Sequence, residues 1–258
     1  MLVDASADLD AAADAAAWGA MSNAGQTCVG IERVYVVDSV YETFLGKLKE
    51  KVAALRAGDD DGASYGPMTL PSQLNVVERH LREAVERGGQ ACVGGADAVD
   101  APYVKPVVLT DVPEDAAAVR EETFGPTVTV TPVPSMDDGI RLANASSYAL
   151  GSSVFTRSRT AGLAAARALR AGMTSVNAVV AFAAVPSLPF GGSGESGFGR
   201  IHGADGLREF SRAKAITRQR MKPLVRTTTF TRTPADMDRI VTLMTMLHGG
   251  LKRAKKKE

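Results

Sequence analysis

Apolar residues recur along this chain with two different periods, and the two kinds of stretch alternate. Stretches with the three-to-four-residue spacing of an amphipathic helix are 4–24, 41–55, 73–87, 137–145 and 159–170. The β-branched run at 33–37 predicts a buried strand, and the segments 103–109, 127–133, 152–155 and 172–177 are also predicted to be strands. Residues 214–221 are compatible with a final strand. This alternation predicts an α/β domain in which helices flank a mostly parallel sheet.

The sequence changes character beyond Pro223. We therefore expect one domain over residues 1–222 and an extension over residues 223–258. Within the extension, residues 234–247 carry apolar side chains at helical spacing, and residues 252–257 are almost all basic. Either the helix docks on its own domain ahead of a solvated tail, or it lies on an anionic membrane surface. The first interpretation is favoured, because the basic run is short and follows the helix instead of lining its polar face.

Composition narrows the classes of function. With 45% apolar and 23% charged residues, the 258 residues suffice for a globular core. A net charge of +1 gives no reason to expect nucleic-acid binding. Three histidines and two cysteines cannot supply the clustered ligands of a structural zinc site, so we expect no metal.

The compartment is inferred from the cysteines and the N-terminus. Cys28 and Cys92 are compatible with one disulfide, but nothing else indicates an oxidising compartment. The N-terminus is rich in Asp and Ala and lacks the basic and apolar regions of a signal peptide. No stretch reaches the ~20 apolar residues that span a bilayer. We therefore expect a cytoplasmic protein.

Cys28 ends the first of three segments with candidate chemistry, Asn23-Ala24-Gly25-Gln26-Thr27-Cys28. A lone cysteine after a helix is usually a small buried apolar residue. Here Gly25 permits the backbone conformations that close approach to a ligand requires, and two polar residues separate it from Cys28. Main-chain N–H groups beside such a cysteine would stabilise a thiolate and an oxyanion. Cys92, in a strand-like apolar pattern, keeps the usual buried interpretation.

The second segment is Glu121-Glu122-Thr123-Phe124-Gly125-Pro126. Two adjacent acidic residues in a loop are usually solvated charges and nothing more. An acid and an aromatic residue followed by Gly-Pro, however, predict a rigid turn that holds a carboxylate and a ring towards a common ligand.

The third segment is a glycine-rich stretch over residues 189–200. Its glycines at 192, 194 and 197 formally match the dinucleotide-binding pattern G-x-G-x-x-G. That pattern requires an apolar strand before it and a helix opening from it. Pro186 and Pro189 precede it here, and further glycines follow. We interpret the segment as an active-site loop and not as a phosphate-binding turn.

In this order, the three segments resemble motifs of the aldehyde dehydrogenase superfamily. The resemblance covers about residues 1–221: residues 25–28 resemble the nucleophile motif, residues 121–126 the second signature, and residues 189–200 the late glycine-rich loop. Asn177 stands where the family has an Asn in the strand leading to that loop. One motif alone is weak, but three in register are specific.

The resemblance implies oxidation of an aldehyde to a carboxylic acid with NAD or NADP. Cys28 would be the catalytic nucleophile, forming a thiohemiacetal and then a thioester that water hydrolyses with the help of a general base. The Cys28 main-chain N–H and a side-chain amide would hold the oxyanion. Glu122 and Phe124 would bind the nicotinamide ribose and ring, and Phe190 would line the substrate channel.

The sequence also departs from the family pattern. The family's general-base Glu lies in a Glu-Leu-Gly-Gly-Lys stretch before the nucleophile, and Met1 stands just after that place. We therefore expect an aldehyde dehydrogenase catalytic domain truncated at its N-terminal side, with the NAD-binding half largely absent. Cofactor binding would then be weak, and the chain alone weakly active or inactive. Residues 202–203 and the extended tail resemble the fatty- and aromatic-aldehyde branch, whereas residues 30–34 resemble the semialdehyde members, which leaves the aldehyde open.

Two other functions stay open. The chain is compatible with a non-catalytic assembly or regulatory partner of a full-length aldehyde dehydrogenase, because the family's final strand joins a neighbouring subunit and residues 214–221 match its place. Esterase or acyl-transfer chemistry at Cys28 would need no cofactor. Besides a small-molecule aldehyde, we expect a homo-oligomer or a complementing chain, since the face that meets the missing half would expose apolar surface.

Overall fold

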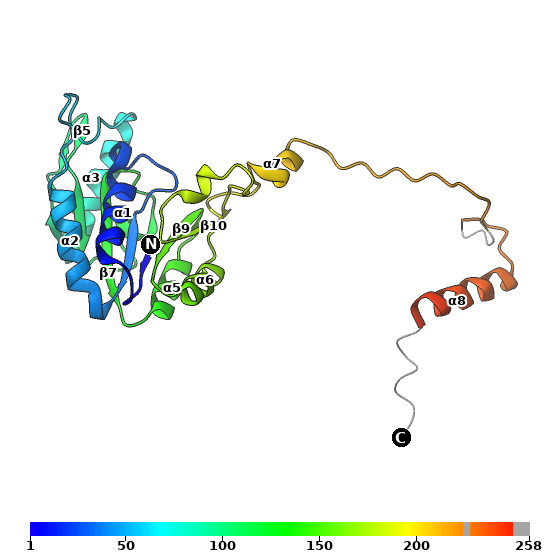
Figure 1. Cartoon of the computed structure of the whole chain (residues 1–258). Coiled ribbons are helices and arrows are strands. Elements are labelled where there is room, and N and C mark those ends of the chain that lie inside the picture. Colours follow the sequence, from blue (N-terminus) through cyan, green and yellow to red (C-terminus); the bar gives the residue numbers. More distant parts are fainter. Residues whose placement is uncertain (224–227, 250–258) are drawn as a thin grey trace, which may run out of the picture. The chain divides into compact units, whose positions relative to one another are not determined.

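Figure 1 shows the computed structural model, which describes residues 1–223 and 228–249. The chain divides into two units, Met1–Arg212 and Ala213–Glu258. The strands, all in the first unit, are β1 Leu2–Val3, β2 Arg33–Val37, β3 Gln90–Val93, β4 Val99–Asp100, β5 Tyr103–Val104, β6 Val107–Thr110, β7 Thr127–Val133, β8 Tyr148–Ala149, β9 Gly151–Phe155, β10 Met173–Val176 and β11 Ser193–Gly194. The helices of this unit are α1 Leu9–Met21, η1 Ser22–Gly25, η2 Asp38–Val40, α2 Tyr41–Ala53, α3 Pro71–Glu86, α4 Ala117–Arg120, α5 Met136–Asn144, α6 Arg159–Ala168, η3 Ala181–Ala184 and α7 Gly203–Glu209. The second unit contains α8, Pro234–His248.

Seven strands form the main sheet, in the order β10-β9-β1-β2-β7-β6-β3. All neighbouring strands in it are parallel except β3, which pairs antiparallel with β6 at one edge. The expected α/β fold with a mostly parallel sheet and flanking helices is therefore confirmed.

Both faces of the sheet are covered by helices. Successive side chains of a strand point to opposite faces, so neighbouring residues of β2 belong to different cores. Val34 and Val36 of β2 belong to the large core that also contains side chains of α1, α2 and α3. Tyr35, between them, belongs to a smaller core with side chains of α5 and α6. Burial on both faces explains why β1 and, after Arg33, β2 are continuously apolar.

Helix α1 leads directly to the nucleophile segment. It begins after Asp8, whose side chain accepts the N–H groups of Asp10 and Ala11, as a good N-cap does. Its alanines at 12, 13, 16, 17 and 20 are buried. Such small side chains allow close packing against α2, which lies beside it. The C-terminus of α1, and with it Cys28, is thereby fixed to the body of the domain.

Two expectations about secondary structure need correction, and one strand of the main sheet was not predicted. Residues 103–109 form two strands and not one, because Pro106 lacks the N–H that a continuous ladder needs. Residues 214–221 form no strand, since the described part of their unit offers no strand edge to pair with. The two-residue strand β1, too short to show an alternating pattern, was not predicted.

The C-terminal helix is present as expected. Helix α8 spans Pro234–His248, and none of its residues is buried. The basic run at 252–257 lies outside the described residues. In the part of the chain that the structure describes, no helix is long and apolar enough to cross a membrane.

Candidate active site

Cys28 follows a sharp change of backbone direction at the end of α1. Asn23, Ala24 and Gly25 have φ angles of 55°, 56° and 72°, three consecutive residues in the left-handed region. Only glycine adopts this conformation without steric cost, so Asn23 and Ala24 must be held in it by their surroundings. Ala24 is buried in the main core, which supplies part of that restraint.

The first and second segments of the sequence are in direct contact. A Cβ atom placed on Gly25 would fall well inside van der Waals contact with the carbonyl group of Gly125. Gly25 thus serves the close approach expected of it, although the neighbour is the main chain of the second segment. This contact fixes the loop of Cys28 against the turn that carries Glu122.

Gln26 secures the loop from the other side. Its Oε1 accepts the N–H of Thr69 at 2.8 Å, and its Nε2 donates to the carbonyl oxygens of Asn23 at 2.9 Å and Pro67 at 3.3 Å. Asn23 Nδ2 in turn donates to the Gln26 carbonyl oxygen at 2.9 Å. Gln26 therefore links the loop of Cys28 to the loop of residues 67–69 by hydrogen bonds.

Cys28 itself is exposed and is a free thiol. The hydrogen bonds of the described residues leave its main-chain N–H without an acceptor. Cys92, the other cysteine, is half-buried in β3, and its Sγ lies 3.4 Å from the hydroxyl of Thr110. Both cysteines are free, so the disulfide considered from the sequence is not formed.

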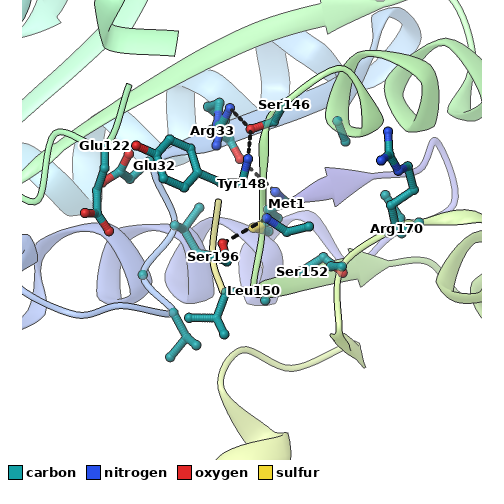
Figure 2. Close-up of a pocket in the computed structure, with 18 of the residues that line it drawn as sticks. Met1, Glu32, Arg33, Glu122, Ser146, Tyr148, Leu150, Ser152, Arg170 and Ser196 are labelled. Carbon is teal, nitrogen blue, oxygen red and sulfur yellow. Dashed lines mark hydrogen bonds between the residues drawn. The ribbon is translucent and has the colours of Figure 1, made fainter. Parts of the chain in front are cut away.

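A cavity of about 330 Å³ opens beside Cys28. Its lining includes Cys28, Glu32, Glu122, Tyr148 and Arg170. Figure 2 shows Glu122 and Glu32 together at one end and Arg170 at the other. The structure thus brings Cys28 and Glu122 to one cavity, whereas Phe124 and Phe190 are not part of its lining.

Glu32 lines the cavity but was not predicted from the sequence as a site residue. Its carboxylate accepts the main-chain N–H groups of Phe124 at 3.0 Å and Thr123 at 3.3 Å. Burial raises the pKa of the Glu32 carboxyl, while these two hydrogen bonds act in the opposite direction. Phe124 has a φ of 49°, strained for a bulky side chain, and Glu32 holds it there. The sequence offered one indication of this role: Glu32 is an acidic residue placed between the apolar Ile31 and the apolar strand β2.

A second set of polar contacts braces the same turn from α3. His80, fully buried, has Nδ1 at 3.0 Å from the Thr123 hydroxyl and Nε2 at 3.2 Å from Glu121. Arg79 donates to the same Glu121 carboxylate at 2.6 Å, which with His80 holds the pKa of that carboxyl below its ordinary value. Glu121 and Thr123 therefore fix the turn and leave Glu122 between them exposed.

Phe190 lies in an apolar cluster next to the nucleophile. It exchanges two main-chain hydrogen bonds with Ile201 and packs edge-on against Phe182, with ring centroids 6.2 Å apart. Phe182 and Val29, the residue after Cys28, belong to the same cluster. Phe190 is thus connected to the nucleophile loop through apolar contacts.

The glycine-rich segment is a loop, as expected. Gly192 and Gly194 lie at the two-residue strand β11, and coil follows Gly197 until residue 203, so no helix opens from the pattern. The loop is fixed by Ser196, whose Oγ accepts the N–H of Ala149 at 2.9 Å, and by the close approach of Gly172 to Gly191. A phosphate-binding turn is not formed here.

Asn177 connects two strand ends. Its Oδ1 accepts the Thr156 N–H and its Nδ2 donates to the Thr156 carbonyl oxygen, both at 2.9 Å. Its φ of 54° is in the left-handed region, where Asn is tolerated better than most residues. Asn177 therefore sets the direction of the chain towards the glycine-rich loop.

The fold and site define an α/β protein with an exposed, loop-borne thiol at a glutamate-lined cavity. Residues 1–216 match the aldehyde dehydrogenase family. The chain belongs to this family of oxidoreductases, which confirms the resemblance found in the sequence.

Individual relatives agree with this assignment. The chain is 39% identical over 211 residues to 4,4'-diapolycopene aldehyde oxidase of Methylomonas sp, covering 82% of this chain and 39% of that protein. It is 36% identical over 212 residues to succinate-semialdehyde dehydrogenase (NADP(+)) of Deinococcus radiodurans, covering 81% of this chain and 44% of that protein. The chain thus spans less than half the length of these curated relatives.

Solved structures give the same result. The NAD-dependent aldehyde dehydrogenase of Sinorhizobium meliloti superposes with a TM-score of 0.77 and 31% identity, over 82% of this chain and 42% of that one. Betaine aldehyde dehydrogenase of Staphylococcus aureus, solved with NAD+, gives 0.76 and 29%, over 81% and 42%.

Proposed function

We propose that residues 1–222 are the catalytic part of an NAD- or NADP-dependent aldehyde dehydrogenase, with Cys28 as its nucleophile. One observation carries the proposal: the exposed Cys28 thiol lines the same cavity as Glu122, on loops that meet at Gly25 and Gly125. A nucleophile must be accessible and held in place, and this loop satisfies both conditions.

The chemistry proposed for Cys28 is that of the aldehyde dehydrogenase family. Its sulfur adds to the aldehyde carbon, a carbon–sulfur bond forms, and the carbonyl electron pair moves to oxygen. The free Cys28 main-chain N–H is available to stabilise that oxyanion. A bound NAD or NADP would supply the acceptor for a hydride from the same carbon, so that Cys28 would be left as a thioester. Water then hydrolyses the thioester and releases the carboxylic acid.

The proposed cofactor contacts are made by Glu122 and Phe124. The exposed Glu122 carboxylate opens onto the cavity of Cys28, which suits a hydroxyl-bearing ribose, while Glu32 and His80 fix the turn from behind. Phe124 would contact the nicotinamide ring from this turn, outside the present cavity lining. Phe190, in the cluster that contains Val29, would line the aldehyde channel.

We further propose that the 258 residues alone bind the cofactor weakly and turn over little aldehyde. The glycine pattern at residues 192–197 does not open directly into a helix, so it does not provide the helix N-terminus that takes a pyrophosphate. Activity would then need a complementing chain or segment. The partner that we propose is either further copies of this chain or such a complementing chain. The names of the relatives suggest succinate semialdehyde and 4,4'-diapolycopene aldehyde as the first substrates to test.

Acyl transfer to Cys28 tests the nucleophile without any cofactor. We expect p-nitrophenyl acetate to acetylate the full chain at Cys28, as located by peptide mass spectrometry, with release of one nitrophenol per chain. Cys28→Ser should abolish the modification, and Cys92→Ser should leave it unchanged. Equal slow acetylation of both cysteines would contradict the proposal and favour a non-catalytic assembly partner.

A further inference from the structure

Charge is distributed very unevenly between the two units. Residues 213–258 contain 12 Lys and Arg against 3 Asp and Glu, a formal net charge of +9. Residues 1–212 contain 18 basic and 26 acidic residues, a net charge of −8. The total of +1 conceals this division, so the exclusion of polyanionic partners from the net charge does not hold for the second unit.

Helix α8 adds an exposed apolar face to this basic unit. Met237, Val241, Met244 and Leu247 recur at helical spacing along one side, with exposures of 45%, 58%, 54% and 67%. Asp238, Thr242 and Thr245 occupy the other side, together with the exposed Met246.

The helix has little to stabilise it within its own unit. Its N-terminus is closed by a capping box between Thr233 and Asp236, but none of its residues is buried. Isolated helices of about 15 residues are marginal in water, because propagation barely offsets the cost of nucleation. A surface that takes up the apolar face would therefore stabilise the helix and be bound by it.

We propose that the second unit binds an anionic lipid surface through α8. The helix lies in the plane of the interface with its Met-, Val- and Leu-bearing face among the acyl chains, and the basic residues Lys214, Arg218 and Arg220 ahead of it lie at the headgroups. The helix lies on the bilayer and does not cross it, since no helix of the described residues is long and apolar enough to span one. A nucleic acid would match the charge but leave the apolar face unused. A second copy would match that face but bring two units of +9 together.

The experiment is flotation of the full chain with lipid vesicles. We expect binding to vesicles of phosphatidylcholine mixed with phosphatidylglycerol, little binding to phosphatidylcholine alone, and a decrease as salt is raised. Circular dichroism should show a gain of helix on binding. No flotation with either vesicle, or equal flotation with both, would overturn the proposal.

The helix offers a matched pair of variants. Met244→Gln and Met246→Gln make the same chemical change two residues apart, but Met246 points away from the proposed lipid face. We expect Met244→Gln to lower the partition coefficient about five-fold or more, because one buried methionine side chain is lost from the bilayer, and Met246→Gln to leave it nearly unchanged. Equal effects of the two would show that no particular face is used.

A charge variant separates lipid from other polyanions. Replacing Lys214, Arg218 and Arg220 together by Gln should lower partitioning about a hundred-fold, at roughly five-fold per charge near an anionic surface. An electrophoretic shift with a DNA duplex provides the counter-test. DNA binding that exceeds vesicle binding and is unaffected by Met244→Gln would overturn the proposal in favour of a nucleic-acid partner. A dimer that dissociates on Met244→Gln, without vesicle binding, would overturn it in favour of self-association.

Discussion

A methyl group added at Gly25 would collide with the carbonyl group of Gly125, on the turn that carries Glu122. The left-handed φ of Gly25 adds to that strain. We expect Gly25→Ala to lower the free energy of unfolding by about 2 kcal/mol or more, measured by urea denaturation. The chain offers a control in Gly46 of α2, where an added Cβ meets nothing within 4 Å.

Gly46→Ala should raise the free energy of unfolding by roughly 0.5–1 kcal/mol, since alanine is the better helix former. If Gly25→Ala is as stable as wild type, the two motifs do not depend on their contact at Gly25.

Glu32 gives a pH dependence whose sign can be worked out. Burial raises the pKa of its carboxyl above the ordinary 4.5, so the unfolded chain ionises first as the pH rises. The contribution of this group to stability is complete below pH 4.5 and is lost as the pH rises through the folded-state pKa. The stability of wild type relative to Glu32→Gln should therefore fall as the pH is raised from 4.5. A difference between the two that rises with pH would contradict this account.

Among the elements, α3 is coupled to the site through His80. Burial lowers the pKa of His80, so the folded chain keeps the ring neutral against Thr123 while the unfolded chain takes up a proton. Stability should fall as the pH drops below the ordinary value of 6.5. We expect His80→Gln to reduce this loss between neutral and mildly acidic pH in thermal denaturation. An unchanged pH profile in the variant would place the acid sensitivity elsewhere.

The elements themselves were largely predictable from the sequence. Apolar periodicity located α1 to α3, α5, α6 and α8, and β-branched runs located most strands of the main sheet, because these patterns follow directly from burial on one or two faces. The strand predicted at residues 214–221 is not formed, because a strand needs a neighbouring strand and the local sequence does not reveal whether one is present. The two-residue β1 is too short for any pattern, although it lies in the middle of the sheet.

The site was predictable in its parts and not in its contacts. Motif resemblance indicated Cys28 and Glu122, which the structure places on one cavity. The approach of Gly25 to Gly125 and the burial of Glu32 both depend on chain segments about 100 residues apart. From the sequence alone, Glu32 would be interpreted as a solvated charge, because its burial depends on the distant turn whose N–H groups it accepts.

At the scale of the whole molecule, the chain covers 39% and 44% of two of its relatives. We expect NADH or NADPH formation from an aliphatic or aromatic aldehyde by this chain alone to be far below that of a full-length relative at saturating cofactor, because the proposed weak cofactor binding would limit turnover. Turnover equal to that of a full-length relative would contradict the proposed dependence on a complementing segment.

The central claim is that the Cys28 sulfur adds to a carbonyl carbon, and aldehyde protection against alkylation tests it most directly. The full chain is treated with iodoacetamide, and the modified fraction of each cysteine is followed by peptide mass spectrometry. We expect the exposed Cys28 to react roughly ten-fold or more faster than the half-buried Cys92, and a saturating aldehyde to slow Cys28 alone as the thiohemiacetal forms. Similar rates at the two cysteines, or no protection of Cys28 by any aldehyde, would contradict the account.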